Sequence, residues 1–320
     1  MSGVTLIIVN WNGGALLAEC LQCVRAQTVL PDEVIVVDNA SSDDSLDRLI
    51  PWDRMRVLRM GSNLGFAAGN NRAIAACRTE YVALLNPDAF AAQDWLEQLL
   101  RAADTWPGAA SFGSRQLMRE DNRRLDGVGD CYHWSGLVWR EGHGFLQTDK
   151  HLVARAIFAP CAAAALYRRS ALVAAGGFDE SYFCYVEDVD LGFRLRLAGH
   201  ICRYVPDAVV EHVGGASSGG ERSDFATFHG HRNLVWTFVK NMPGPLLFLL
   251  LPLHLFATCA ALALSPLRGR AGVVVRAKWA ALVGLGEVLR SRAAVQRERR
   301  ASIGDIWRAL DKRFWPRPRG

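Results

Sequence analysis

Short apolar runs alternate with helix-like segments over roughly the first quarter of the chain, and this alternation most limits how the chain can fold. The runs cover 4–9, 33–38, 55–60 and 81–85, and the first is continuous, as expected for a strand buried on both faces of a sheet. Helices are predicted over 15–26, from 43 to about 50, and over 66–76. Strands that alternate with helices in this way form a parallel, doubly wound sheet. The predicted fold class is therefore α/β with a mainly parallel sheet.

Acidic or amide side chains follow two of these strands. Asp38 ends the second strand, and Asn86, Pro87 and Asp88 follow the fourth. In an open α/β sheet, ligands bind in the crevice beyond the carboxyl ends of the strands, where a carboxylate can hold a divalent cation against a diphosphate. All three residues of Asn-Pro-Asp also favour turns, so an ordinary turn is the alternative for this tripeptide taken alone.

The sequence lacks the two glycine-rich loops that most often bind nucleotide phosphates. After the first strand the chain reads Asn10-Trp11-Asn12-Gly13-Gly14, without a Gly-x-Gly-x-x-Gly pattern, and it contains no Gly-Lys-Ser/Thr phosphate loop. A dinucleotide-binding dehydrogenase is therefore excluded, and a nucleotide would be held by side chains and a metal. The cysteines are scattered, which favours reduced thiols. The N-terminus leads directly into a strand, which predicts no signal peptide.

Six short segments of this sequence occur in the order that is typical of one enzyme family. They span about two thirds of the chain and cover residues 7–12, 36–43, 63–71, 85–88, 176–180 and 187–191. With these segments the chain resembles family 2 of the inverting nucleotide-sugar glycosyltransferases, and most of all its bacterial rhamnosyltransferase-like branch. The resemblance implies the GT-A fold, which is Rossmann-like. It also implies transfer of a sugar from a nucleotide donor to an acceptor, with inversion at the anomeric carbon.

The resemblance assigns a set of polar residues to the donor site. Asp38 would accept a hydrogen bond from the ring N–H of uracil or thymine, so the expected donor is a UDP- or dTDP-sugar. Arg72 would pair with an oxygen of the diphosphate. The donor-binding residues expected on this basis are Asn10, Asp38, Asn63, Arg72, Asn86, Asp88 and Arg232. Two alternatives stay open: Asp38 could only cap the turn at 39–43, and Arg72 could be a solvated residue on a helix face.

The tripeptide Asn86-Pro87-Asp88 stands where the family usually has an Asp-x-Asp motif, with an amide in place of the first acid. By the resemblance, Asp88 would be the main protein ligand of Mg²⁺ or Mn²⁺, whose role is to stabilise the departing nucleoside diphosphate as a Lewis acid. His212, which follows a strand predicted at 208–210, is the candidate second ligand. A histidine in such a position can equally be structural, and imidazole suits Mn²⁺ better than Mg²⁺.

A second acidic cluster opens a helix that is predicted to begin near Glu187 and to end near residue 198. By the resemblance, Asp188 removes the proton from the acceptor hydroxyl, and Glu187 orients Asp188 or holds the acceptor. Acids in a first turn also favour the helix dipole whatever the function, which is the alternative. Asp190 and Arg194 are i and i+4 on this helix, and a surface ion pair is expected for them. The segment 115–151 reads as irregular and is expected to cover the acceptor side.

The C-terminal part of the chain differs in composition from the rest. Residues 246–264 contain no Lys, Arg, Asp or Glu, and residues 265–320 carry 14 Lys/Arg against 4 Asp/Glu. The apolar stretch is close to the ~20 residues that span a bilayer. We therefore predict a catalytic domain over 1–240 and a hydrophobic and basic region over 241–320 that associates with anionic membrane lipid.

The orientation of this region follows from its charge. A single span would carry the basic tail across the membrane against the positive-inside rule. An interfacial or re-entrant helix pair on the cytoplasmic face of the cell membrane, peripheral or anchored, is therefore preferred. A buried core helix with a solvated basic face is the alternative.

These patterns and the resemblance together imply a metal-dependent inverting glycosyltransferase of cell-envelope glycan synthesis. The expected donor is dTDP-rhamnose, and the expected acceptor is a polyprenyl-diphosphate-linked glycan or a polysaccharide. A different UDP-sugar donor and a catalytically silent nucleotide- or glycan-binding scaffold are the alternatives. Nucleic-acid binding is not expected, because the basic tail has few aromatic residues on which bases could stack.

Overall fold

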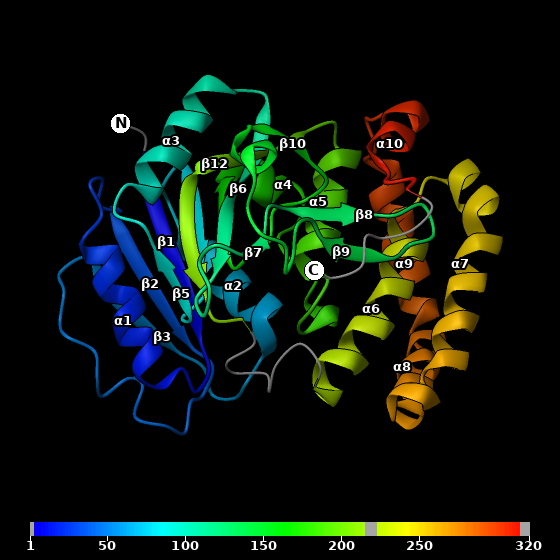
Figure 1. Ribbon diagram of the computed structural model, residues 1–320, viewed down its shortest axis with the longest axis horizontal. Coiled ribbons are helices and arrows are strands. Elements are labelled where there is room, and N and C mark those ends of the chain that lie inside the picture. The colour runs from blue at the N-terminus through cyan, green and yellow to red at the C-terminus, as the bar shows by residue number, and fades with distance from the viewer. Residues whose placement is uncertain (1–2, 215–222, 314–320) are drawn as a thin grey trace.

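The computed structural model describes residues 3–214 and 223–313, so Arg317 and Arg319 of the basic tail lie outside the described residues. The first four predicted strands form within one residue of their expected bounds, and the strand predicted at 208–210 is part of a longer one, Ile201–His212. The first four are β1 (Val4–Asn10), β2 (Glu33–Asp38), β3 (Met55–Arg59) and β4 (Tyr81–Leu85), with α1 (Gly14–Arg25) between β1 and β2 and α2 (Gly65–Ala76) between β3 and β4. These strands are parallel neighbours at one end of the sheet (Figure 1).

The sheet continues with strands from the second half of the chain. They are β5 (Ala89–Ala91), β6 (Ala109–Met118), β7 (Leu125–Gly127), β10 (Arg155–Ile157), β11 (Ala164–Arg168) and β12 (Ile201–His212). The strand order is β10-β12-β6-β11-β4-β1-β2-β3, with β5 paired to β12 and β7 to β6. β11 runs antiparallel between β4 and β6, whereas β6 and β12 are parallel. The sheet is therefore mixed but mostly parallel, which confirms the predicted fold class.

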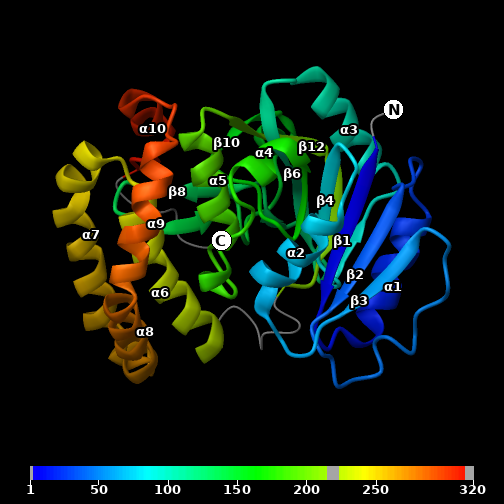
Figure 2. The ribbon, with the colours of Figure 1, turned by 180° about the vertical axis from the view of Figure 1, so that it is seen from behind.

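Helices cover both faces of the sheet (Figure 2): α1 and α3 (Trp95–Thr105) on one face, and α2, α4 (Arg169–Ala174) and α5 (Glu187–Leu197) on the other. Val4, Leu6 and Ile8 of β1 pack toward α1 and α3. Ile7 and Val9 pack on the opposite face. Successive strand residues point to opposite faces, and both faces are buried, which explains why β1 is a continuous apolar run.

The helix predicted from residue 43 to about 50 was wrong, because this stretch forms turns instead. Its polar side chains bond to nearby groups. The Ser45 hydroxyl donates to the Asp43 carboxylate at 2.6 Å, and the Ser42 N–H donates to Asn12 Oδ1 at 2.8 Å. Such local side-chain bonds compete with the helical pattern.

The segment predicted to be irregular, 115–151, is also more ordered than expected. It contains the end of β6, strand β7, a hairpin of β8 (Asp130–Tyr132) and β9 (Val138–Arg140), and the 3-10 helix η1 (Asp149–Leu152). A C-terminal residue fixes this hairpin, since the Trp134 N–H donates to the Asp311 carbonyl at 3.0 Å and the Asp311 N–H donates to the Tyr132 carbonyl at 2.9 Å. The hairpin is thus held by contacts far apart in sequence.

The surface ion pair expected for Asp190 and Arg194 was wrong, because both residues are buried. Arg194 Nε donates to Asp190 Oδ2 at 2.8 Å. The Lys240 ammonium and the Asn241 amide both donate to Asp190 Oδ1, each at 2.7 Å. Burial opposes ionisation, but the two cations outweigh it and lower the pKa of Asp190 to about 2. This network fastens α5 to the helix that carries Lys240.

Replacing Asp190 by asparagine is therefore expected to lower the free energy of unfolding by about 3–5 kcal/mol, since the buried Arg194 would lose its carboxylate and the buried Lys240 would keep only Asp179. Urea unfolding at neutral pH measures this. Because the folded pKa lies below the ordinary value of about 4, the contribution is present above that pH and is lost as the pH falls toward 2. The exposed pair of Asp44 and Arg48 supplies the control, and Asp44→Asn should leave the free energy of unfolding nearly unchanged, because exposed ion pairs are screened by solvent. Equal losses for the two variants would contradict this account.

Five helices complete the fold beside the sheet (Figure 2): α6 (Asp224–Asn241), α7 (Gly244–Leu264), α8 (Ala271–Val283), α9 (Leu285–Arg297) and α10 (Ile303–Ala309). Of these, α6, α7, α9 and α10 share a hydrophobic core with the β8–β9 hairpin and α5, in which Leu246 and Leu250 of α7 lie in one cluster with Tyr132 and Phe193. Helix α8 packs in a separate cluster with α6 and α9. Among the described residues, α7 is the one helix that is long and apolar enough to cross a membrane. The division of roles between 1–240 and 241–320 stays a prediction.

Candidate active site

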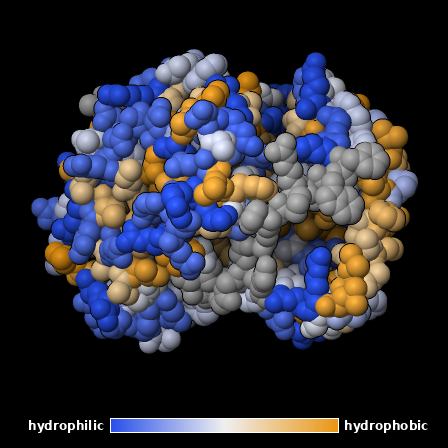
Figure 3. Space-filling model, viewed as in Figure 1, coloured by the Kyte–Doolittle hydropathy of each residue, from blue (hydrophilic) through white to orange (hydrophobic). Residues whose placement is uncertain are grey.

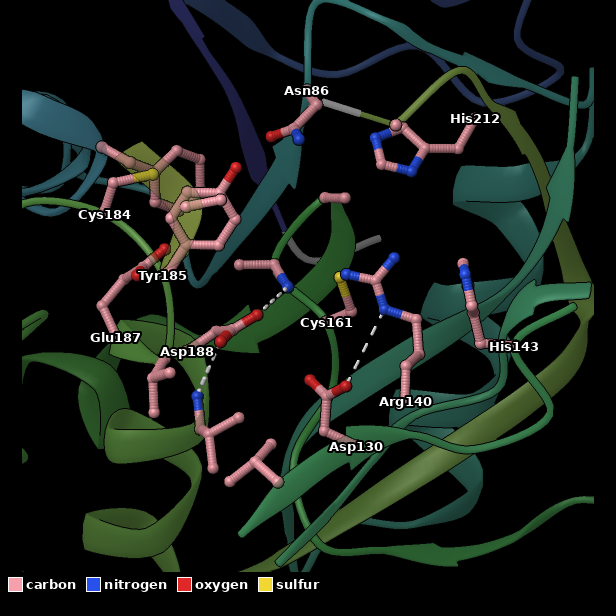
Figure 4. Close-up of a pocket in the computed structure, with 18 of the residues that line it drawn as sticks. Asn86, Asp130, Arg140, His143, Cys161, Cys184, Tyr185, Glu187, Asp188 and His212 are labelled. Carbon is pink, nitrogen blue, oxygen red and sulfur yellow. Dashed lines mark hydrogen bonds and ion pairs between the residues drawn. The ribbon is translucent and has the colours of Figure 1, made fainter. Parts of the chain in front are cut away.

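A cavity of about 1030 Å³ opens beyond the carboxyl ends of β1 and β4. Trp11 and the tripeptide 86–88 line it on the side of the sheet. Strand β9 with the loop that follows it, and the segment 183–189 at the start of α5, line other walls (Figure 4). This is the crevice in which open α/β sheets bind ligands.

The cavity brings together some of the predicted site residues and not others. Those that line it are Asn63, Asn86, Asp88, Glu187, Asp188 and His212. Those that do not line it are Asn10, Asp38, Arg72 and Arg232. The acidic residues proposed for the metal and for proton removal therefore share one cavity, whereas part of the predicted donor site lies behind or beside its wall.

Asn10 and Asp38 lie side by side at the ends of β1 and β2, and both are buried. The Asn10 amide donates to Asp38 at 3.3 Å and to the hydroxyls of Ser41 and Ser45 at 3.0 and 2.9 Å. The Ser41 N–H also reaches Asp38 at 3.4 Å. These contacts stabilise the turn that follows β2, and the next residue, Asn39, lines the cavity. Base recognition by Asp38 stays a prediction.

The two predicted arginines lie outside the cavity wall. Arg72 is exposed on α2. Arg232 donates to the backbone carbonyls of Ser181 and Tyr182 at 3.0 and 2.9 Å, so its contacts hold the loop before α5. Their roles at the diphosphate stay predictions.

Asp88 and His212 meet at one side of the cavity. Pairing of β5 with β12 sets His212 opposite Ala89, next to Asp88. His212 Nε2 lies 3.3 Å from Asp88 Oδ1, and His212 Nδ1 lies 2.9 Å from Asp126 Oδ2. Burial lowers the pKa of His212, but the two carboxylates outweigh this and raise it to about 9. The imidazole is thus held between two buried acids.

This arrangement fits a divalent cation. Histidines that bind metals usually have their second ring nitrogen on a carboxylate, which fixes the ring orientation. Asp126 holds His212 in this way, and the other ring nitrogen, Nε2, faces Asp88 Oδ1 at 3.3 Å. Asp88 and His212 would therefore be the ligands, with Asp126 behind them, and a carboxylate with an imidazole suits Mn²⁺ better than Mg²⁺.

Asp188 lies at the other side of the cavity, in the first turn of α5. Its carboxylate accepts hydrogen bonds from the N–H groups of Ala162 at 3.1 Å and Val189 at 2.8 Å (Figure 4). Burial raises the pKa of Asp188 above its ordinary value, while the Ala162 N–H and Arg140 oppose the shift. A carboxylate whose pKa is moved toward neutral is suited to act as a general base.

The loop that leads into α5 is strained. Phe183, Tyr185 and Val186 all have positive φ angles, of 64°, 68° and 70°, which cost energy for residues other than glycine. The buried Asn233 amide holds this backbone by donating to the carbonyls of Tyr182, Cys184 and Tyr185. This backbone conformation leads the chain into α5 so that Glu187 and Asp188 lie at the cavity wall.

Sequence patterns missed Asp126, Asp130, Arg140 and Cys161. Arg140 Nη1 lies 2.6 Å from Asp126, and Arg140 Nε lies 3.8 Å from Asp130 (Figure 4). Arg140 thus links the side of the cavity with His212 to the side with Asp188. The only sequence signal was the presence of acids and an arginine in a stretch that read as irregular.

Comparison with known proteins identifies a family and its relatives. Residues 5–174 match the family model described as Glycosyl transferase family 2. N-acetylglucosaminyl-diphospho-decaprenol L-rhamnosyltransferase of Mycobacterium tuberculosis is 29% identical over 248 residues, which cover 70% of this chain and 80% of that protein. The O-antigen chain rhamnosyltransferase RfbN of Salmonella typhimurium is 26% identical over 212 residues, which cover 65% of this chain and 66% of that protein.

Solved structures of glycosyltransferases are similar in fold. GalNAc-T7 with UDP, GalNAc and Mn²⁺ has a TM-score of 0.61 at 14% identity, covering 75% of this chain and 48% of that one. The mannosyltransferase PcManGT from Pyrobaculum calidifontis, with GDP-Man and Mn²⁺, has a TM-score of 0.55 at 19% identity, covering 96% of this chain and 88% of that one. At these identities the likeness concerns the fold, which is the predicted GT-A fold.

Proposed function

The chain belongs to glycosyl transferase family 2, and from this premise we propose that it moves L-rhamnose from dTDP-rhamnose onto a polyprenyl-diphosphate-linked glycan, with inversion and with the help of a divalent cation. One observation carries the proposal: Asp88, His212 and Asp188 line the same cavity, and His212 and Asp188 lie on different sides of it (Figure 4). An inverting transfer needs such an arrangement, because the leaving group and the attacking hydroxyl are on opposite faces of the sugar.

The chemistry divides between the two sides of the cavity. Asp188 takes the proton of the acceptor hydroxyl. At the same time the hydroxyl oxygen bonds to the anomeric carbon, and the bond from that carbon to the diphosphate breaks. A cation held by Asp88 and His212 would supply Lewis-acid stabilisation of the nucleoside diphosphate. Asn63 and Asn86 offer amide groups on the donor side, and Glu187 stands beside Asp188, where it can orient the base or hold the acceptor.

Support for the substrates comes from the relatives' names. The relative from Mycobacterium tuberculosis is a rhamnosyltransferase named for a sugar–diphospho–decaprenol acceptor, and the relative from Salmonella typhimurium is named for rhamnosyl transfer in the O-antigen chain. Both names specify the transfer of rhamnose. We therefore prefer dTDP-rhamnose to a UDP-sugar donor.

The experiment is an assay of purified protein in detergent with dTDP-rhamnose or a panel of UDP-sugars, Mn²⁺ or Mg²⁺, and an N-acetylglucosaminyl diphosphate on a short polyprenyl chain. The expected product has the mass of the acceptor plus one deoxyhexose, and chelator abolishes its formation. Transfer from a UDP-sugar alone would contradict the donor proposed here, and full activity in chelator would contradict the need for a metal.

We further propose that α7 and α8 lie along the cytoplasmic face of the cell membrane. On their outward side, Phe248, Leu249, Phe256 and Trp279 are 65–76% exposed, and we call this side the apolar face. The apolar face lies at the edge of the molecule (Figure 3). On its inward side α7 buries Leu246, Leu250 and His254 against the protein. A helix packed in this way fits the membrane surface better than a span across it, and the nearby arginines suit anionic lipid.

Substitution of Phe256 and Trp279 by serine is expected to weaken binding to vesicles of phosphatidylglycerol by about 100-fold or more, since each large apolar side chain contributes about 1.5–3 kcal/mol when it leaves water. Co-sedimentation with vesicles measures this. Ile50→Ser is the matched control, because Ile50 is 61% exposed in the loop between β2 and β3. Unchanged vesicle binding by the double variant would contradict the assignment of the apolar face.

A further inference from the structure

Two acidic side chains lie close together in the cavity, and the transfer reaction uses only one of them as a base. A carboxylate oxygen of Asp130, the sulfur of Cys161 and a carboxylate oxygen of Asp188 lie within 4.8 Å of one another. Asp130 lines the cavity although it is only 5% exposed. Among the described residues its carboxyl forms no hydrogen bond, and its closest charged partner is Arg140 Nε at 3.8 Å (Figure 4).

The hairpin holds Asp130 firmly in this place. Asp130 and Arg140 are directly opposite each other in the β8–β9 pair. The Asp130 N–H donates to the Ala159 carbonyl at 2.8 Å, in the same short segment whose Ala162 N–H bonds to Asp188 at 3.1 Å. Asp130 and Asp188 are therefore positioned relative to each other by shared backbone contacts.

The two carboxyl groups differ in their surroundings. Asp188 accepts two backbone N–H groups, which favour its ionised form. Burial, together with the charge of Asp188, raises the pKa of Asp130 to about 8, against the opposing effect of Arg140. At neutral pH Asp130 is therefore a neutral carboxylic acid, which can both donate and accept a hydrogen bond.

A sugar hydroxyl has the same requirement, since it donates one hydrogen bond and accepts others. Neighbouring hydroxyls of one sugar ring lie close enough to reach two carboxyl groups that are within 4.8 Å of each other. Water does not offer two hydroxyls on one rigid frame, so a pair of this kind can tell a sugar acceptor from solvent. A buried polar group that loses its intended partner discriminates strongly against the wrong molecule.

We propose that Asp130 is an acceptor-binding residue, which hydrogen-bonds the sugar hydroxyl beside the one that Asp188 deprotonates, with Arg140 holding Asp130 in place. The inference rests on the proposed transfer reaction and adds to it a requirement on the acceptor. The acceptor sugar must carry a second hydroxyl next to the one that is glycosylated.

The test combines Asp130→Ala and Asp130→Asn with N-acetylglucosaminyl diphosphate on a short polyprenyl chain, and with analogues of it that lack one ring hydroxyl at a time. With the intact acceptor, Asp130→Ala is expected to lower kcat/KM for the acceptor about tenfold, the effect of one lost hydrogen bond, and Asp130→Asn should restore part of it. With the analogue that lacks the bound hydroxyl, Asp130→Ala should cause little further loss. Asp149→Asn, an exposed acid at the start of η1, is the matched control.

The outcomes separate this inference from the proposed function. Equal losses for Asp130→Ala with every acceptor would overturn the inference and leave the transfer reaction intact, as would a matching loss in affinity for the nucleotide sugar. If the wild-type protein hydrolyses the donor but glycosylates no acceptor offered, the acceptor of the proposed function is wrong. In that case the rate of donor hydrolysis decides the inference. If Asp130→Ala lowers this rate as much as Asp188→Ala does, the inference is overturned. If its loss in rate is at least tenfold smaller, the inference is supported.

Discussion

Replacing Asp188 by asparagine is expected to lower kcat for glycosyl transfer by about 10²–10⁴-fold, which is the usual contribution of a positioned general base. Asparagine has the same shape, and its one carbonyl oxygen can still accept one of the two N–H groups that Asp188 binds, from Ala162 or from Val189, but it cannot take up a proton. The affinity for the nucleotide sugar should persist, because Asp188 stands on the acceptor side of the reaction. Steady-state kinetics and calorimetric titration with the donor measure the two effects separately.

Asp207→Asn is a suitable control for this variant, since Asp207 is exposed on β12 and does not line the cavity. Its kinetics should match those of the wild type. A kcat within a fewfold of the wild type for Asp188→Asn would contradict the assigned role, and it would favour the alternative of a silent binding scaffold.

Asp88→Asn is expected to have the second large effect, through the metal. Removing a carboxylate ligand leaves His212 as the remaining predicted ligand, so the affinity for Mn²⁺ in the presence of dTDP should fall at least 100-fold. We expect this because loss of a group that only orients a ligand already costs 10–100-fold. Electron paramagnetic resonance of free Mn²⁺ measures the affinity without reference to activity. Transfer should fall in parallel at limiting Mn²⁺.

Asp126→Asn tests the same metal site through the residue that holds the His212 ring. Asp126 touches His212 Nδ1 at 2.9 Å and is expected to act by orienting the ring, so its replacement should weaken Mn²⁺ binding by about 10–100-fold. Asp88→Asn should therefore be the more damaging of the two variants. The opposite order, or an unchanged Mn²⁺ affinity in Asp88→Asn, would contradict the assigned ligands.

The parallel half of the fold could be predicted from the sequence because its signals are local. Strands β1, β2 and β4 are apolar runs bounded by turn residues, and burial on both faces makes these runs nearly continuous. Strand β3 is short and only partly buried. The place of Asp88 followed from the same logic, since the end of a parallel strand faces the ligand crevice. Asp188 and His212 came from the family resemblance, and both do line the cavity.

The cavity wall that carries Asp130 and Arg140 could not be predicted, because pairing between distant segments builds it. Asp126 lies on β7, which pairs with β6, and Asp130 and Arg140 meet only when the β8–β9 hairpin closes. A C-terminal residue, Asp311, then fixes the hairpin. No periodicity within 115–151 reveals these contacts.

Two errors have a common cause in side-chain contacts that sequence spacing does not show. The spacing of Asp190 and Arg194 indicates a helix pair but says nothing of burial, which comes from Lys240 and α6 packing over them. The helix predicted after Asp43 was replaced by turns that polar side chains stabilise. Contacts misled the prediction of burial in the first case, and they outweighed local helix propensity in the second.

The configuration of the new glycosidic bond tests the central claim most directly, because the claim is a single displacement between Asp88 with His212 on one side and Asp188 on the other. Proton NMR of the product formed from a donor of known anomeric configuration reads it out. The account predicts an inverted anomeric centre in every product of the wild-type protein. A product with retained configuration would contradict it.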